Sequence, residues 1–339
     1  MDETMLTHAS EPYDHISTGQ LPSNDTVAKL VQMAHARFVS EDEGENSTVY
    51  PMLAQVPRNL FGICVAGTSG EVFAVGDADY EFSIMSVSKP FLFALVCELL
   101  GAAVVRDRIG VGATGRAFNS LAAIEASIDG RTNPMVNSGA IATTSLVPGA
   151  NAEEKWRFIH EGLCRFAGRN LSLNDEVHAS AIDTNHRNRS IARLLRSLDA
   201  IFADPDEAVS LYTKQCSLNV SARDLALMGA TLADGGVHPI TKERVVSAAT
   251  CHYTLAVMAT AGLYESSGDW LYEIGLPGKS GIGGGIVTVS PGKGGLGTFA
   301  PPLDSAGNSV KGQQVAKFLS QSLGLDLFVS TSSIQRDTI

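Results

Sequence analysis

The chain has little of what marks extracellular, metal-binding or nucleic-acid-binding proteins. Its 339 residues contain only five cysteines, an odd and scattered set, which is typical of reduced thiols in a cytosolic protein. No Cys/His spacing resembles a metal site, so we expect no metal and no cofactor. Lysine and arginine total 25 against 36 acidic residues, and the net charge of −11 argues against nucleic acid as a partner.

Long apolar runs are also missing. No uninterrupted apolar stretch is long enough to span a bilayer, which excludes an integral membrane protein with helical spans. The segment Met1-Asp2-Glu3-Thr4 lacks the basic and apolar regions of a signal peptide. We therefore expect a cytoplasmic protein with no membrane partner.

The length and the 44% hydrophobic content indicate a globular protein with a sizeable core. We expect a polar tail over residues 1–23, a single domain over 24–325 and a second tail over 326–339. Strand patterns come from both ends of the domain and helical patterns from its middle. This distribution predicts a sheet lobe from 24–85 and 265–325, a helical lobe over about 86–264, and a site in the cleft between them.

Hydrophobic periodicity predicts individual elements. The helical patterns cover residues 25–39, 153–166, 189–202, 223–232, 243–261 and 309–323, with Asn308 as the cap of the last. The strand patterns cover residues 60–66, 71–76, 270–276, 284–289 and 295–299. Ser221-Ala222-Arg223-Asp224 resembles a capping box. The expected fold class is α/β (α+β), with an antiparallel five-stranded sheet flanked by helices and a helical lobe.

The segment Ser86-Val87-Ser88-Lys89 contains a serine three residues before a lysine at the start of an apolar helix. This spacing places both side chains on one helix face, where a lysine amine can take the proton of a serine nucleophile. One of the serines can also be interpreted as an ordinary helix cap, since Ser is a preferred N-cap residue. The apolar helix that follows favours the first interpretation, because an unpaired buried charge is costly and needs a function.

Two further segments bear on the chemistry. Lys279-Ser280-Gly281 resembles the Lys-Thr/Ser-Gly strand of serine acyl-transfer enzymes of the β-lactamase and penicillin-binding type. Gly110-Val111-Gly112-Ala113-Thr114-Gly115 matches the dinucleotide-binding pattern G-x-G-x-x-G. It follows a predicted helix rather than a strand, so we do not interpret it as a nucleotide site.

Other segments occur in the order found in one family. They are Asn133-Pro134-Met135-Val136-Asn137-Ser138-Gly139-Ala140-Ile141, Arg187-Asn188, Tyr212 with Gln215-Cys216-Ser217, Gly262-Leu263-Tyr264, and Gly275 to Gly285. With the serine and lysine motifs, they make the chain from about residue 50 to 312 resemble the serine-dependent glutaminases, which share the β-lactamase-like fold. The resemblance implies hydrolysis of L-glutamine to L-glutamate and ammonia, and by analogy a homodimer or homotetramer.

The resemblance also implies roles for individual residues. Ser86 is expected to be the nucleophile, Lys89 its general base, and Tyr264 a group that assists proton transfer to the leaving ammonia. The backbone N–H groups of Ser86 and Ile282 are expected to form the oxyanion hole. The residues expected to hold the polar groups of the substrate are Tyr50, Asn137, Asn188 and Tyr212.

Two positions depart from the family pattern. Ala181 stands where the family has a glutamate that binds the α-ammonium of glutamine, and Met85 stands where it usually has a glutamine. The departures leave open a related serine amidase or esterase that acts on a compound without the α-amino group. A non-enzymatic homologue that binds a small molecule or a partner is a third possibility, and a β-lactamase-like role a fourth.

Overall fold

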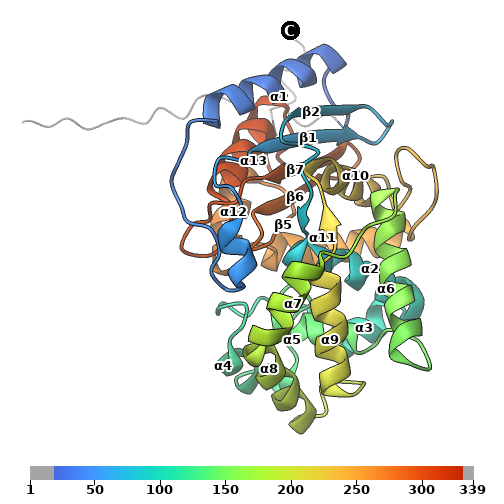
Figure 1. Cartoon of the computed structure of the whole chain (residues 1–339). Helices are drawn as coiled ribbons and strands as arrows, with labels where there is room; N and C mark the ends of the chain where they lie inside the picture. The colour runs from blue at the N-terminus through green and yellow to red at the C-terminus, as the bar shows by residue number, and fades with distance from the viewer. Residues whose placement is uncertain (1–18, 331–339) are drawn as a thin grey trace, which may run out of the picture.

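The computed structural model describes residues 19–330, and a five-stranded antiparallel sheet organises them (Figure 1). The strand order is β2-β1-β7-β6-β5. The strands are β1 (Gly62–Gly67), β2 (Val72–Gly76), β5 (Gly278–Ser280), β6 (Gly285–Ser290) and β7 (Gly294–Phe299). Because β1 pairs with β7, the sheet joins the first and last parts of the chain, and this prediction is confirmed. Of the two expected tails, 1–23 and 326–339, residues 1–18 and 331–339 lie outside the described residues.

Helices make up most of the rest. They are α1 (Asn24–Phe38), α2 (Ser88–Leu100), α3 (Ala102–Ile109), α4 (Leu121–Glu125), α5 (Asn137–Thr144), α6 (Ala152–Ala167), α7 (Asp175–Thr184), α8 (His186–Ser197), α9 (Pro205–Cys216), α10 (Ala222–Ala233), α11 (Ala248–Ala261), α12 (Ser267–Ile274) and α13 (Val310–Ser322). A short antiparallel pair, β3 (Phe82–Ser83) with β4 (Asn219–Val220), joins the start of α2 to the segment before α10.

The two faces of the sheet carry different helices. Helices α1 and α13 cover one face, and α10 packs along β7, β6 and β1 on the other (Figure 1). Alternation along β1 explains this arrangement, since successive side chains of a strand point to opposite faces. Ile63 and Val65 join the core under α1 and α13, whereas Cys64 and Ala66 contact the α10 side. Both faces of the sheet are therefore buried at β1, β5, β6 and β7, whereas the edge strand β2 is half-buried or exposed.

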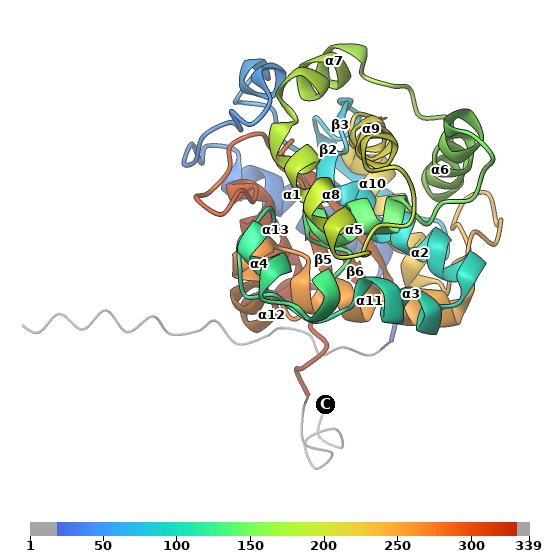
Figure 2. The same ribbon diagram turned by 90° about the horizontal axis from the view of Figure 1, so that it is seen from below.

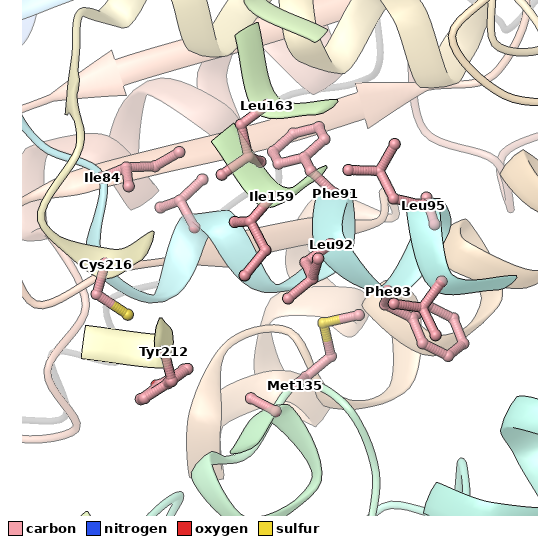
Figure 3. Close-up of a cluster of buried hydrophobic side chains, with 14 of the residues drawn as sticks. Ile84, Phe91, Leu92, Phe93, Leu95, Met135, Ile159, Leu163, Tyr212 and Cys216 are labelled. Carbon is pink, nitrogen blue, oxygen red and sulfur yellow. The ribbon is translucent and has the colours of Figure 1, made fainter. Parts of the chain in front are cut away.

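Helix α2 lies at the centre of the helical part. Every residue from Ser88 to Cys97 is buried, which confirms the expected buried helix. Figure 3 shows its side chains Phe91 and Leu92 close to Ile159 and Leu163 of α6, in the same buried cluster as Tyr212 and Cys216 of α9. Helices α5, α8 and α9 pack on one another beside it, as Figure 2 shows from below. As a result of this packing, Ser86, Ser88 and Lys89 of the motif are all buried.

One expected strand is wrong. Residues 270–274 of the predicted strand 270–276 belong to helix α12, and the fifth strand is β5. Trp270 and Ile274 are buried while Tyr272 between them is 90% exposed, a helical spacing that an alternating strand cannot produce. Gly275, in the left-handed conformation with φ 70°, ends the helix.

Element boundaries shift at other positions. Helix α8 begins at His186 and ends at Ser197, so the expected helix over 189–202 is too late at both ends. Helix α11 begins only at Ala248, and Ser247 caps it. Ser309 rather than Asn308 caps α13, because its hydroxyl accepts from the N–H of Gly312. The capping box of Ser221 and Asp224 is confirmed.

Among residues 19–330, no single helix is both long enough and apolar enough to cross a membrane. Met85–Leu100 and Ala102–Ile109 together have sufficient length and apolar composition, but they are bent by 120° relative to each other.

Candidate active site

A tight turn before α2 presents Ser86. Met85–Val87 forms one turn of 3-10 helix, and Ser88 then begins α2. Met85 has φ 49°, a left-handed conformation that is unusual for a residue with a side chain. The Ser88 hydroxyl donates to the Met85 carbonyl at 2.8 Å and accepts from the Gln215 side-chain amide at 2.8 Å, which secures the turn. Ser88 is thus a structural serine, and Ser86 is not a helix cap, because α2 has no side-chain cap.

Lys89 is fully enclosed behind this turn. Its Nζ donates to the carbonyl of Met135 at 3.2 Å and to Asn137 Oδ1 at 2.8 Å. No ion pair in the described part of the chain involves Lys89. Burial lowers the pKa of Lys89 to about 7, because the charged form loses its hydration. The amine is therefore substantially neutral near neutral pH.

Asn137 links three helices. Its Oδ1 accepts from Lys89 and, at 3.3 Å, from the Tyr212 hydroxyl. Its Nδ2 donates to Asn188 Oδ1 at 2.9 Å. Asn137 is the first residue of α5, Asn188 lies in the first turn of α8 and Tyr212 in α9. Burial also raises the pKa of Tyr212, so its phenol stays protonated and able to donate.

Tyr264 and Lys279 close the other side. The Tyr264 hydroxyl lies 3.3 Å from the Ser280 carbonyl, and its ring is 4.6 Å from that of Phe118. Burial raises the pKa of Tyr264, and hydrogen bonds with Ser86 and Ser280 oppose that rise. Lys279 Nζ lies 4.5 Å from the centre of the Tyr264 ring and donates to the carbonyls of Gly262 and Ser280 at 2.8 and 2.7 Å. Burial and then the nearby Lys89 lower the pKa of Lys279 well below its ordinary value.

A pocket opens directly over Ser86, and we call it the Ser86 pocket. It is lined by Val49, Tyr50, Met85, Ser86, Phe118, Asn119, Asn137, Thr184, Asn185, Arg187, Asn188, Tyr212, Cys216 and Ile282. Ile282 follows β5 in a glycine-rich segment that lies against the Ser86 turn. A Cβ added to Gly281 would be only 3.1 Å from the Ile84 carbonyl oxygen. The structure thus brings strand β5 and the start of α2 together at one wall of the pocket.

Two backbone N–H groups at this wall of the pocket are free to donate to a ligand. Among the hydrogen bonds between residues 19 and 330, none uses the N–H of Ser86 or of Ile282. Ser86 is buried and Ile282 is half-buried, and free donors beside the Ser86 hydroxyl are suited to an incoming oxygen atom.

The structure assembles the residues that the sequence singled out. Six of them line the Ser86 pocket: Tyr50, Ser86, Asn137, Asn188, Tyr212 and Ile282. Lys89 and Tyr264 lie just behind it, joined to its lining through Asn137 and Ser86. Their individual roles stay a prediction.

Three residues in or beside the site have no role that the sequence alone assigns. Arg187 donates from Nε to the carbonyl of Asn119 at 2.9 Å, and its position next to Asn188 is a usable signal. Phe118 has no local signal, because only the fold brings it to Tyr264. Lys279 belongs to a sequence motif, but its place under the Tyr264 ring depends on tertiary packing.

Comparison with known proteins gives a consistent picture. A family model described as Glutaminase matches residues 44–328. "Glutaminase 2" of Yersinia pestis is 68% identical over 317 residues, covering 94% of this chain and 93% of that protein. A glutaminase of Brucella canis is 47% identical over 312 residues, covering 92% and 98%.

Solved structures agree in the fold. The probable glutaminase YbaS superposes with a TM-score of 0.90 at 43% identity, covering 91% of this chain and 100% of that one. The probable glutaminase from Bacillus subtilis, solved with 6-diazo-5-oxo-L-norleucine, gives a TM-score of 0.79 at 30% identity, covering 91% and 98%. The expected β-lactamase-like fold is confirmed. The chain therefore belongs to the glutaminase family, hydrolases that act on the amide of glutamine.

Proposed function

We propose that the chain hydrolyses L-glutamine to L-glutamate and ammonia through an acyl-enzyme on Ser86, with Lys89 as the general base. The lowered pKa and the hydrogen bonds of the Lys89 amine are the observation that most supports this mechanism. A neutral amine has two N–H bonds and one lone pair. The two N–H groups donate hydrogen bonds to the backbone carbonyl of Met135 and to Asn137 Oδ1, so the lone pair remains to accept the Ser86 proton.

The reaction would proceed in two balanced stages. Ser86 Oγ attacks the carboxamide carbon while its proton moves to Lys89 Nζ. The C–N bond then breaks, and the amide nitrogen takes a proton through the Tyr264 hydroxyl and leaves as ammonia. Water attacks the resulting ester, gives its proton back through the same groups and releases the carboxylate with Ser86 restored. These steps need no cofactor.

The two free N–H groups support an oxyanion hole. In each tetrahedral intermediate the former carbonyl oxygen becomes negatively charged, and the N–H groups of Ser86 and Ile282 would donate to it. Two such preorganised donors contribute several kcal/mol to the stability of the transition state, about 3 for one donor in the best-studied case.

Neutral polar groups would hold the rest of the substrate. Tyr50, Asn137, Asn188 and Tyr212 offer amide and phenol groups around the pocket. Burial raises the pKa of Tyr50, which keeps its phenol a donor. Residues 24–325 would act as one catalytic domain, with the pocket between its sheet and helical parts.

The pH dependence of the reaction follows from Lys89. The pKa of Lys89 is about 7, so its basic form decreases tenfold for each pH unit below that value. We expect kcat/KM for glutamine to rise about tenfold per unit below pH 7 and to level off above about pH 8. Ammonia release between about pH 5.5 and 9 measures this profile. A flat profile across that range would contradict Lys89 as the base.

Lys279 is expected to act as a positioning residue. In Lys279→Met the carbonyls of Gly262 and Ser280 lose a donor, and Ser280 precedes the segment that carries the Ile282 N–H. We expect kcat to fall about 10- to 100-fold with little change in KM, less than the roughly 100- to 1000-fold for outright loss of one oxyanion donor, because the N–H is displaced and not removed. The matched control is Lys311→Met, because Lys311 also donates to a carbonyl, that of Val39, and lies over a Phe61 ring far from the site. Equal losses in both variants would indicate a general packing defect.

We also propose a homodimer or homotetramer in the cytoplasm. The assembly is proposed by analogy with the family. The five cysteines are all free thiols, and four of them are buried, which suits a reducing compartment. Light scattering during gel filtration tests the assembly: a mass of 35.7 kDa would be that of a monomer and would contradict it.

A further inference from the structure

The Ser86 pocket has an unusual charge balance for a site that receives an amino acid. Within the described residues, its lining includes no aspartate or glutamate, and its one ionised side chain at neutral pH is the cation Arg187. Lys89, directly behind the lining, adds further positive character whenever it is protonated. A substrate ammonium placed here would leave water without gaining a negative partner.

The side-chain oxygens of Asn137 and Asn188 are already used. Asn137 Oδ1 accepts from both Lys89 and Tyr212, and Asn188 Oδ1 accepts from Asn137 Nδ2. In contrast, no hydrogen bond between described residues engages Asn188 Nδ2 or the two terminal nitrogens of Arg187. Among the described residues, the side-chain oxygens of Asn119 and Asn185 also lack a partner, but they belong to neutral amides. The free charged group of the lining is therefore the Arg187 donor, which matches a carboxylate and not an ammonium.

Helix α7 does not supply a negative charge to the pocket either. Ala181 lies three and four residues before Thr184 and Asn185, which line the pocket, and is 1% exposed. Residues at these spacings share one helix face. The methyl group of Ala181 thus occupies that face without an acceptor. Asp183 is exposed and lies outside the pocket lining, so it does not supply the missing charge.

We infer that the pocket selects primary amides that carry a carboxylate but no ammonium at the far end, the ω-amides of dicarboxylic acids, over L-glutamine. Glutaramate, which is glutamine without its α-amino group, represents the class. The inference rests on the proposed acyl-enzyme route: Ser86 displaces ammonia from the amide carbon, and water then releases glutarate. Arg187 and Asn188 would hold the carboxylate of the substrate.

The direct test compares glutaramate with L-glutamine as substrates of the purified full chain by ammonia release. We expect kcat/KM for glutaramate to exceed that for glutamine about tenfold or more, because an ion pair at a binding site commonly changes affinity by at least that factor. A tenfold or larger preference for glutamine would overturn the inference while leaving the acyl-enzyme route intact. Hydrolysis of neither amide would contradict both.

A pair of variants identifies the cause. Ala181→Glu introduces a carboxylate on the pocket face of α7, and we expect it to shift the ratio toward glutamine by about tenfold or more. Ala181→Gln has nearly the same size without the charge and should leave the ratio unchanged. If both variants shift the ratio equally, shape rather than charge governs selection, and the inference is wrong. The wild-type ratio remains decisive even if neither variant folds.

Discussion

Ser86→Ala is expected to lower kcat for glutamine by about 10⁴-fold or more, as for removal of other serine nucleophiles. The Ser86 hydroxyl is the group that forms the ester in the proposed route. Cys216 also lines the pocket, but burial raises the pKa of its thiol, which makes it a poor nucleophile. The melting temperature should change little, because the change removes one oxygen atom at the surface of a pocket. Ammonia release and thermal unfolding measure the two effects.

Ser88→Ala is the matched control. The Ser88 hydroxyl bonds to Met85 and Gln215 but lies outside the Ser86 pocket. We expect this variant to lose about 1 to 3 kcal/mol of stability, because the buried Gln215 amide loses its acceptor, and to keep a turnover far above that of Ser86→Ala, because the nucleophile is still present. Full activity in Ser86→Ala, or a covalent electrophile found on Ser88 by mass spectrometry, would refute Ser86 as the nucleophile.

Gly297→Ala is expected to destabilise the fold by about 3 kcal/mol or more, through overpacking in the closely packed interior. Gly297 lies on β7 directly beneath α10. A Cβ there would be 2.0 Å from the Ala222 carbonyl oxygen and 2.7 Å from the Ala226 nitrogen. Both are backbone atoms of one helix, so relief requires the whole of α10 to move away from the sheet.

Gly268→Ala tests the same substitution where space is available. Gly268 lies in α12, and an added Cβ meets no atom within 4 Å. Alanine favours a helix over glycine, so we expect a gain of about 0.5 to 1 kcal/mol. The midpoints of chemical denaturation compare the two variants. A similar midpoint for Gly297→Ala and wild type would show that α10 is not held against β7 as the structure has it.

Local patterns in the sequence were sufficient for much of the fold. The hairpin of β1 and β2, the buried character of α2 and the capping box at Ser221 each depend on residues within a few positions of one another. The segment 270–276 failed because its apolar residues fit either period. Burial of Trp270 and Ile274 around exposed Tyr272 is a result of packing against α13 and the sheet.

Residue patterns alone identify the chemical groups of the site: a serine and a lysine at helical spacing, a lysine on a late strand, and an ordered set of glutaminase motifs. The protonation and hydrogen bonding of these groups depend on the folded chain. The carbonyls that accept from Lys89 belong to Met135 and Asn137, far along the chain, and burial by surrounding helices lowers its pKa. The desolvation of Lys89 and the hydrogen bonds that hold its amine are properties of the assembled interior, since they depend on contacts between segments that no local pattern encodes.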